Sequence, residues 1–274
     1  MKHAAESNAW LESMTKAVYY STEQHQIRHK EKYMALESAR DYRLRWMDFD
    51  RYGRMQPAAV LDIFQDIATL HAEEIGIGRD AMLERGVIWV VVRTKLEMCA
   101  EPEHFQVVTV RTWPHSLSKF SFIRDFTMHD ESGRLLAKAS QEWVLMDVQT
   151  RRFSSPKGIY EGPNDFSEDR AFEKKPRKTP TFDEGNRPVR TITPAYSDID
   201  LNGHVNNAMY ANFIINALEP GAEGALRTLQ IDYRYEAHPN QPILVHTLVE
   251  EERVLMKGLS DDGTVLFLAM LEPQ

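Results

Sequence analysis

The chain of 274 residues has almost no cysteine and no long apolar run. Its single cysteine, Cys99, cannot form an internal disulfide or a cysteine-based zinc cluster, and we interpret it as a small buried apolar residue. No stretch reaches the roughly 20 apolar residues that a membrane-spanning helix requires. The N-terminus also lacks the charged start, apolar centre and cleavage site of a secretory signal. We therefore expect a cytoplasmic protein without a membrane segment.

Positive charge is also in short supply. The chain carries 33 Lys and Arg against 41 Asp and Glu, a net charge of −8. Binding to nucleic-acid phosphates needs a basic face, so this balance argues against a nucleic-acid-binding protein. An acidic partner would have to meet a local basic patch.

Several catalytic and cofactor-binding motifs are missing. The sequence contains neither a Gly-x-Ser-x-Gly nucleophile elbow nor a phosphate-binding glycine loop. His71 and Glu74 are spaced as on one face of a metal-binding helix, but no second histidine follows them. We expect no metal and no cofactor.

The sequence does contain a clear succession of helix and strand patterns. Apolar residues recur with the helical period from Val60 to Leu70, and Pro57 suits the first turn of that helix. The apolar run Val87–Val92, rich in β-branched residues, predicts a central strand. Other strands of this part are expected at Asp41–Met47, Gln106–Thr112, Ser121–His129 and Leu135–Met146.

After a proline-rich, charged stretch the pattern recurs. We expect a second helix at Ala208–Leu218 and strands at Val189–Thr193, Leu229–Tyr235, Ile243–Glu250, Arg253–Ser260 and Thr264–Leu271. Charge runs and few apolar residues are typical of a linker that crosses the surface. The sequence therefore suggests an N-terminal extension (1–38), a first unit (39–153), a linker (154–188) and a second unit (189–274).

An internal repeat supports this division. Asp48–Met55 aligns without a gap on Asp198–Val205, and Thr94–Pro102 aligns on Ile231–Pro239. A strand, a long helix and several antiparallel strands form the order expected when a curved sheet wraps a helix. Two such units predict an α+β fold in which one continuous sheet holds two helices.

The two copies differ where chemistry is concerned. The second copy has Asn202 in place of Tyr52, His204 in place of Arg54, and Glu236 in place of Cys99. We therefore expect the chemistry in the second half, which leaves the first half free to shape a substrate pocket.

The segment Asp198–Asn207 is the candidate active site, because it gathers two carboxylates, an imidazole and three carboxamides before a helix. His204 is the natural proton-handling group near neutral pH. Asp200 and Asn202 lie beside it, and Glu236 is expected at the end of a neighbouring strand. Asp200 could also serve only as a loop or capping residue.

The other polar residues of this segment have simpler interpretations. We assign Asp198 to the turn, and we interpret Asn206 and Asn207 as helix-cap residues. The backbone N–H groups at such a helix start can stabilise a developing oxyanion.

These residues resemble those of the acyl-acyl-carrier-protein (acyl-ACP) thioesterases, bacterial relatives of the plant plastid enzymes. The resemblance covers roughly residues 40–272 and depends on Val87–Arg93, Ile123–Asp125, Trp143–Met146, Thr150–Arg152 and Asp200–Asn207. It implies a double hot-dog fold. It also implies hydrolysis of the thioester between a fatty acyl chain and the phosphopantetheine arm of the carrier protein, which ends chain elongation in fatty acid biosynthesis.

The resemblance also implies roles for individual residues. The catalytic Asp, Asn, His and Glu of the family fall on Asp200, Asn202, His204 and Glu236. Plant members carry a cysteine directly after this Glu, whereas this chain has Ala237. We therefore expect the carboxylates to activate a water molecule, or one of them to attack directly, while His204 and Asn202 orient the group and bind the carbonyl.

The acyl chain is expected in the first half, with Phe64 and Trp89 as candidate walls. For docking of the acidic carrier protein we name Arg124, Arg151 and Arg152. The chain is expected to be a monomer or a homodimer.

An acyl-CoA thioesterase on the same fold is the first alternative function. A non-catalytic acyl-thioester sensor is the second, although residues 1–38 are neither basic nor of helix-turn-helix type, and a dehydratase would need a different acid–base pair.

Overall fold

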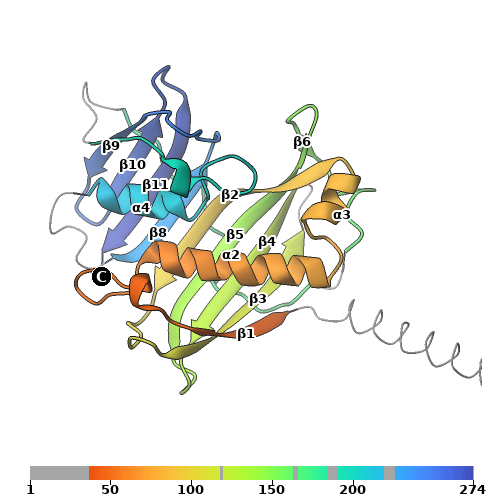
Figure 1. Ribbon diagram of the computed structural model, residues 1–274, viewed down its shortest axis with the longest axis horizontal. Coiled ribbons are helices and arrows are strands. Elements are labelled where there is room, and N and C mark those ends of the chain that lie inside the picture. The colour runs from red at the N-terminus through yellow and green to blue at the C-terminus, as the bar shows by residue number, and fades with distance from the viewer. Residues whose placement is uncertain (1–36, 118–119, 163–165, 184–189, 219–225, 274) are drawn as a thin grey trace, which may run out of the picture.

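The computed structural model describes residues 37–117, 120–162, 166–183, 190–218 and 226–273. It has one continuous sheet of eleven strands with helices on its inner face (Figure 1). The extension expected over residues 1–38 therefore lies almost wholly outside the described residues. No helix within the described ranges is long and apolar enough to cross a membrane.

The elements follow the expected order in both halves. The first half contains β1 (Ser38–Arg43), η1 (Trp46–Asp48), α2 (Pro57–Glu74), α3 (Arg79–Glu84), β2 (Val87–Met98), β3 (Val107–Leu117), β4 (Ser121–His129), β5 (Leu135–Asp147) and β6 (Phe153–Ser154). The second contains β7 (Arg190–Ile192), η2 (Tyr196–Asp198), α4 (Met209–Asn216), β8 (Leu226–Tyr233), β9 (Ile243–Val249), β10 (Val254–Leu259) and β11 (Val265–Pro273).

The strand order reads the same from both ends of the sheet. It runs β1-β3-β4-β5-β2 and then β8-β11-β10-β9-β7, so β2 and β8 join the halves. Thr94, which the repeat aligns with Ile231, is also its partner across this antiparallel junction. A residue that pairs with its own counterpart lies on the local two-fold axis. The predicted repeat and continuous sheet are therefore confirmed.

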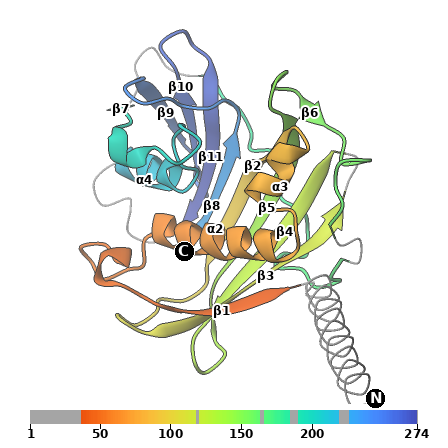
Figure 2. The same cartoon turned by 45° about the vertical axis from the view of Figure 1, so that its right-hand side comes forward.

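The sheet curves around α2 and α4, which lie on the same side of it (Figure 2). Both helices bury their apolar residues in one core shared by the two halves. Within it, the ring of Phe64 on α2 stacks on Phe126 of β4 with 5.0 Å between centroids. Burial of this apolar surface is the main force that holds the sheet around the helices.

Three details differ from the sequence-based expectations. The strand expected over Asp41–Met47 ends at Arg43, because Asp48 accepts a hydrogen bond from the Arg45 backbone N–H (2.6 Å) and closes a helical turn. The six-residue helix α3 was not predicted, since so short an element shows little periodicity. Cys99 is exposed rather than buried, because the chain leaves the sheet after Met98.

The segment 166–183 crosses the outer face of the sheet, opposite the helices. The ring of Phe172 lies between the ammonium groups of Lys95 and Lys138, at 4.9 and 4.7 Å. Further along, the Thr179 backbone N–H donates to Asp232 at 3.2 Å. This part of the expected linker is thus held to both β2 and β8 by specific contacts.

Candidate active site

The loop before α4 is a closed turn built by its own backbone. Ile199 and Val205 form an isolated bridge, and the Asp200 N–H donates to the His204 carbonyl at 2.9 Å. Asp198 accepts from the Ala195 N–H at 2.7 Å, as Asp48 does from Arg45 in the first half. The same turn is therefore present in both halves, and Asp198 has the turn role that we assigned to it.

Asp200 is fixed by this turn but keeps one oxygen weakly held. Its Oδ1 accepts the Asn202 N–H at 2.8 Å, and its Oδ2 lies 3.4 Å from the Asn202 amide nitrogen. A contact of 3.4 Å is long for a hydrogen bond. The half-buried carboxylate is thus oriented and still has an oxygen available for chemistry.

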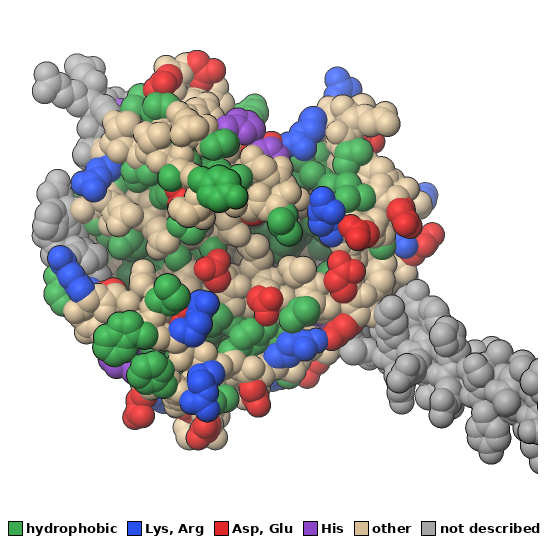
Figure 3. All heavy atoms as spheres, in the orientation of Figure 1, with side chains coloured by type: hydrophobic (Ala, Val, Ile, Leu, Met, Phe, Trp, Pro, Cys, Tyr) green, Lys and Arg blue, Asp and Glu red, His purple; other side chains and the backbone are tan. Residues whose placement is uncertain are grey.

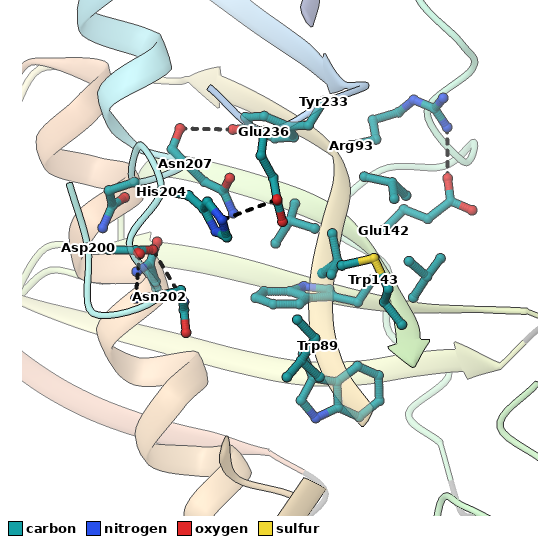
Figure 4. A pocket seen from close by; sticks show the side chains of 18 of the residues that line it. Trp89, Arg93, Glu142, Trp143, Asp200, Asn202, His204, Asn207, Tyr233 and Glu236 are labelled. Atoms are coloured by element: carbon teal, nitrogen blue, oxygen red, sulfur yellow. Dashed lines mark hydrogen bonds and ion pairs between the residues drawn. The ribbon is translucent and has the colours of Figure 1, made fainter. Parts of the chain in front are cut away.

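His204 and Glu236 meet although 32 residues separate them in the sequence. The imidazole Nε2 lies 3.2 Å from Oε2 of Glu236, which follows β8 (Figure 4). The Val205 N–H donates to the Ala237 carbonyl at 3.1 Å and ties the loop to this segment. The two side chains are 27% and 34% exposed, so the pair is open to a substrate.

The first half also reaches this pair. Nη2 of Arg151 donates to Oε1 of Glu236, so each carboxylate oxygen has its own partner. We had named Arg151 for carrier-protein docking, and no linear motif connects it with Glu236, 85 residues away. The structure adds it to the site.

The helix-cap residues and nearby tyrosines support the loop. Asn206 Oδ1 accepts the Ala208 N–H at 2.8 Å, as expected of a cap, whereas the carbonyl of Asn207 accepts from the Tyr233 hydroxyl at 3.1 Å. The Tyr210 hydroxyl accepts from the Ala237 N–H at 3.2 Å, and burial raises its pKa to about 12. Tyr210 therefore stays neutral at physiological pH and acts as a hydrogen-bonding support.

A cavity of about 2230 Å³ extends from this site into the first half. His side chains and charged side chains of both signs surround the hollow between the halves (Figure 3). Its far end is apolar and is lined by Ile77, Met82, Trp89, Phe122, Trp143 and Tyr160. Trp89 is held there by a hydrogen bond to the Ile77 carbonyl (2.9 Å), and its ring meets Phe122 edge to face. Trp143 and helix α3, which also form this wall, were not predicted from the sequence.

Two candidate residues are not where the sequence suggested. Phe64 is fully buried against Phe126 in the main core and does not line the cavity. Arg124 is only 8% exposed and cannot offer a docking charge at the surface. Its guanidinium lies 2.9 Å from His71 Nδ1 and 3.2 Å from Thr112 Oγ1, and burial lowers its pKa to about 10.

Arg124 shares the inner face of β4 with Phe126, two residues further along, because side chains alternate across a strand. Arg151 and Arg152 are exposed at the surface, as docking residues must be. No cluster of three or more His, Cys, Asp or Glu side chains suited to a metal ion occurs in the described part of the chain.

A curved sheet wrapped around two helices, with one polar loop before the second helix, defines a double hot-dog protein. Residues 36–159 match the family described as acyl-ACP thioesterase N-terminal domain, and residues 183–262 match the corresponding C-terminal domain. The chain therefore belongs to the acyl-ACP thioesterase family.

Plant relatives agree with this assignment. The chain is 30% identical over 191 residues to the chloroplastic acyl-[acyl-carrier-protein] hydrolase FATB2 of Cuphea viscosissima and to the chloroplastic palmitoyl-acyl carrier protein thioesterase of Arabidopsis thaliana. Each alignment covers 65% of this chain and 46% of the relative, so the chain spans about half the length of these plant proteins.

The fold is shared with an acyl-ACP thioesterase from Bacteroides thetaiotaomicron. The two are 22% identical with a TM-score of 0.79, over 89% of this chain and 99% of the other. The 12:0-ACP thioesterase from Umbellularia californica is also 22% identical, with a TM-score of 0.74 over 88% and 98% of the two chains. The predicted double hot-dog fold is thus confirmed.

Proposed function

We propose that the protein hydrolyses the thioester of fatty acyl-ACP and releases a free fatty acid. The observation that carries this proposal is the His204–Glu236 pair, 3.2 Å apart at one end of a cavity whose other end is apolar. An acyl chain in the apolar end would bring its thioester carbonyl to the polar end. Family membership and the plant relatives support acyl-ACP as the substrate.

In this proposal, Asp200 acts on the attacking group because the contact of its Oδ2, 3.4 Å from the Asn202 amide nitrogen, is longer than the contacts of both Glu236 oxygens. Asp200 takes a proton from a water molecule, whose oxygen adds to the carbonyl carbon. Alternatively, Oδ2 itself attacks and forms an anhydride that water then cleaves. In either route the carbon–sulfur bond breaks and the pantetheine sulfur leaves as a thiol after it receives a proton.

His204 and Asn202 complete this scheme. The Asn202 amide can donate to the carbonyl oxygen as negative charge develops there. Glu236 Oε2 lies 3.2 Å from His204 Nε2, where its negative charge fixes the direction of the imidazole and stabilises positive charge that develops on it. His204 is then able to deliver the proton that the leaving sulfur needs.

The test is an assay of fatty acid release from acyl-ACP over a panel of chain lengths, with acyl-CoA of the same acyl groups alongside. We expect a higher kcat/KM for acyl-ACP than for acyl-CoA. The His204→Ala variant should lose at least about 100-fold in turnover of acyl-ACP. Faster hydrolysis of every acyl-CoA would assign the protein to the other thiol carrier. Binding without hydrolysis would identify a sensor and refute the proposal.

A single turnover in oxygen-18 water tests for the anhydride route. Attack by water on the thioester places the label in the fatty acid, whereas cleavage of an anhydride at the enzyme carbonyl places it in the carboxylate of Asp200. Label found by mass spectrometry in the peptide that contains Asp200 would exclude direct attack by water.

A further inference from the structure

The turn between β5 and β6 holds Arg151 in an unusual backbone conformation. Its φ is 56°, a left-handed value that is uncommon for residues other than glycine. Asp147 closes the turn, since its carbonyl accepts the Arg151 N–H at 3.0 Å and its carboxylate accepts the Thr150 N–H at 2.7 Å. Such conformations persist only where the surrounding structure fixes them. The turn therefore presents the Arg151 side chain in a defined direction.

That direction leads to Glu236 in the other half. Arg151 is 44% exposed and Glu236 34% exposed, and the guanidinium donates to Oε1 while His204 lies beside Oε2. Glu236 lies beyond the end of β8 at Tyr233, outside the ladder of the sheet. A glutamate there has several rotamers, and two different partners on its two oxygens select one of them.

The side chains of the second half leave one oxygen of Glu236 to a residue of the first. His204 reaches Oε2, and Arg151 is the group that reaches Oε1 among the described residues. Arg151 also lines the cavity that the thioester must enter, so it lies where it can contact the substrate.

We propose that Arg151 is a positioning residue of the thioesterase site: it holds Glu236 in the rotamer that orients His204, so that the catalytic half functions only with the first half in place. This inference depends on the proposed function. It gives Arg151 a role different from that of a surface charge for the carrier protein. A docking charge affects substrate binding, whereas a positioning residue affects turnover.

The experiment compares Arg151→Gln, Arg151→Lys and wild type on two substrates with the same acyl group, acyl-ACP and acyl-pantetheine. Acyl-pantetheine lacks the carrier protein and so cannot report on docking. We expect Arg151→Gln to lower kcat by about 10 to 100-fold on both substrates, because small misplacement of catalytic groups has effects of this order. The KM for acyl-pantetheine should change less than about twofold, and Arg151→Lys should recover part of kcat.

Arg253→Gln is the matched control. Arg253 pairs with Glu250 at similar exposures, 38% and 37%, and neither residue lines the cavity. The control should leave kcat and KM unchanged on both substrates. Equal melting temperatures of Arg151→Gln and Arg253→Gln would show that loss of an exposed ion pair does not disturb the fold.

A double-mutant cycle adds a second readout. If Arg151 acts through Glu236, then Arg151→Gln should cause no further loss in a Glu236→Gln background. Additive losses would overturn the inference, as would a change confined to the KM for acyl-ACP. Neither result affects the proposed function, which fails if wild type does not hydrolyse acyl-ACP, if it hydrolyses every acyl-CoA faster, or if His204→Ala retains full turnover.

Discussion

Asp50 and Asp200 accept the same hydrogen bond, from the backbone N–H two residues further on, at 2.8 Å in both halves of the protein. Their second oxygens differ. In the first half it is paired with Arg54 at 2.9 Å, whereas in the second its partner among the described residues is the Asn202 amide at 3.4 Å. The turn therefore carries a paired carboxylate in one half and an available carboxylate in the other.

This relationship predicts that Asp200→Asn separates folding from catalysis. Asparagine keeps the oxygen that accepts the N–H of residue 202, so the turn and the melting temperature should be preserved. The variant loses the acidic oxygen, and kcat on acyl-ACP should fall by at least about 100-fold. Asp50→Asn is the control and should keep its turnover. Near-normal turnover in Asp200→Asn would limit Asp200 to the turn.

A second prediction concerns the shape of the acyl cavity. Trp89 forms part of its apolar end, whereas Phe64 lies in the main core. Trp89→Ala should enlarge the cavity and shift the preferred chain toward longer or bulkier acyl groups, measured as relative kcat/KM across the chain-length panel.

Phe64→Ala is the contrasting variant. It should lower the free energy of unfolding by about 3 to 5 kcal/mol, because a cavity in a packed core is costly, without changing the order of preferred chains. A change of chain preference in Phe64→Ala with none in Trp89→Ala would contradict this assignment of the cavity wall.

The sequence predicted the elements well because strong local patterns specify them. The apolar face of α2 and the β-branched run of β2 each express one local preference, and the repeat then supplied the continuous sheet. Glu236 was expected at the end of a strand near His204, and its catalytic role was implied by the family resemblance; the contact between the two side chains is visible only in the structure.

The directions of side chains and the contacts between the two halves were harder to predict. Arg124 lies in a strand buried on both faces, and its local sequence does not show which face the side chain takes. The contact between Arg151 and Glu236 depends on how the two halves meet, which no local pattern encodes. Trp143 was missed as a cavity wall because its local sequence does not show which face its side chain takes, and helix α3 was missed because six residues show little periodicity.

A third prediction concerns the carrier protein. Arg152 is exposed next to Arg151 and remains the candidate for docking, whereas Arg124 is buried. Arg152→Glu should raise the KM for acyl-ACP by roughly tenfold, because it replaces an attraction to an acidic partner by a repulsion. The KM for acyl-pantetheine should not change. An equal rise in both values would reject docking at Arg152.

The last prediction concerns the junction of the halves, where Arg93 of β2 holds two carboxylates. Its guanidinium lies 2.7 Å from Asp232 of β8 and 2.7 Å from Glu142 of β5, and Asp232 is almost fully buried. Arg93→Ala leaves both acids without this partner, and the loss of one member of a buried pair typically costs about 3 to 5 kcal/mol. We expect a decrease of that size in the free energy of unfolding, measured by urea denaturation.

Arg111 provides the control, because it is paired with Glu37 at exposures of 38% and 46%. Arg111→Ala should lower the free energy of unfolding by less than about 1 kcal/mol. A loss as small in Arg93→Ala would show that the contacts of Arg93 with Asp232 and Glu142 do not hold the two halves together.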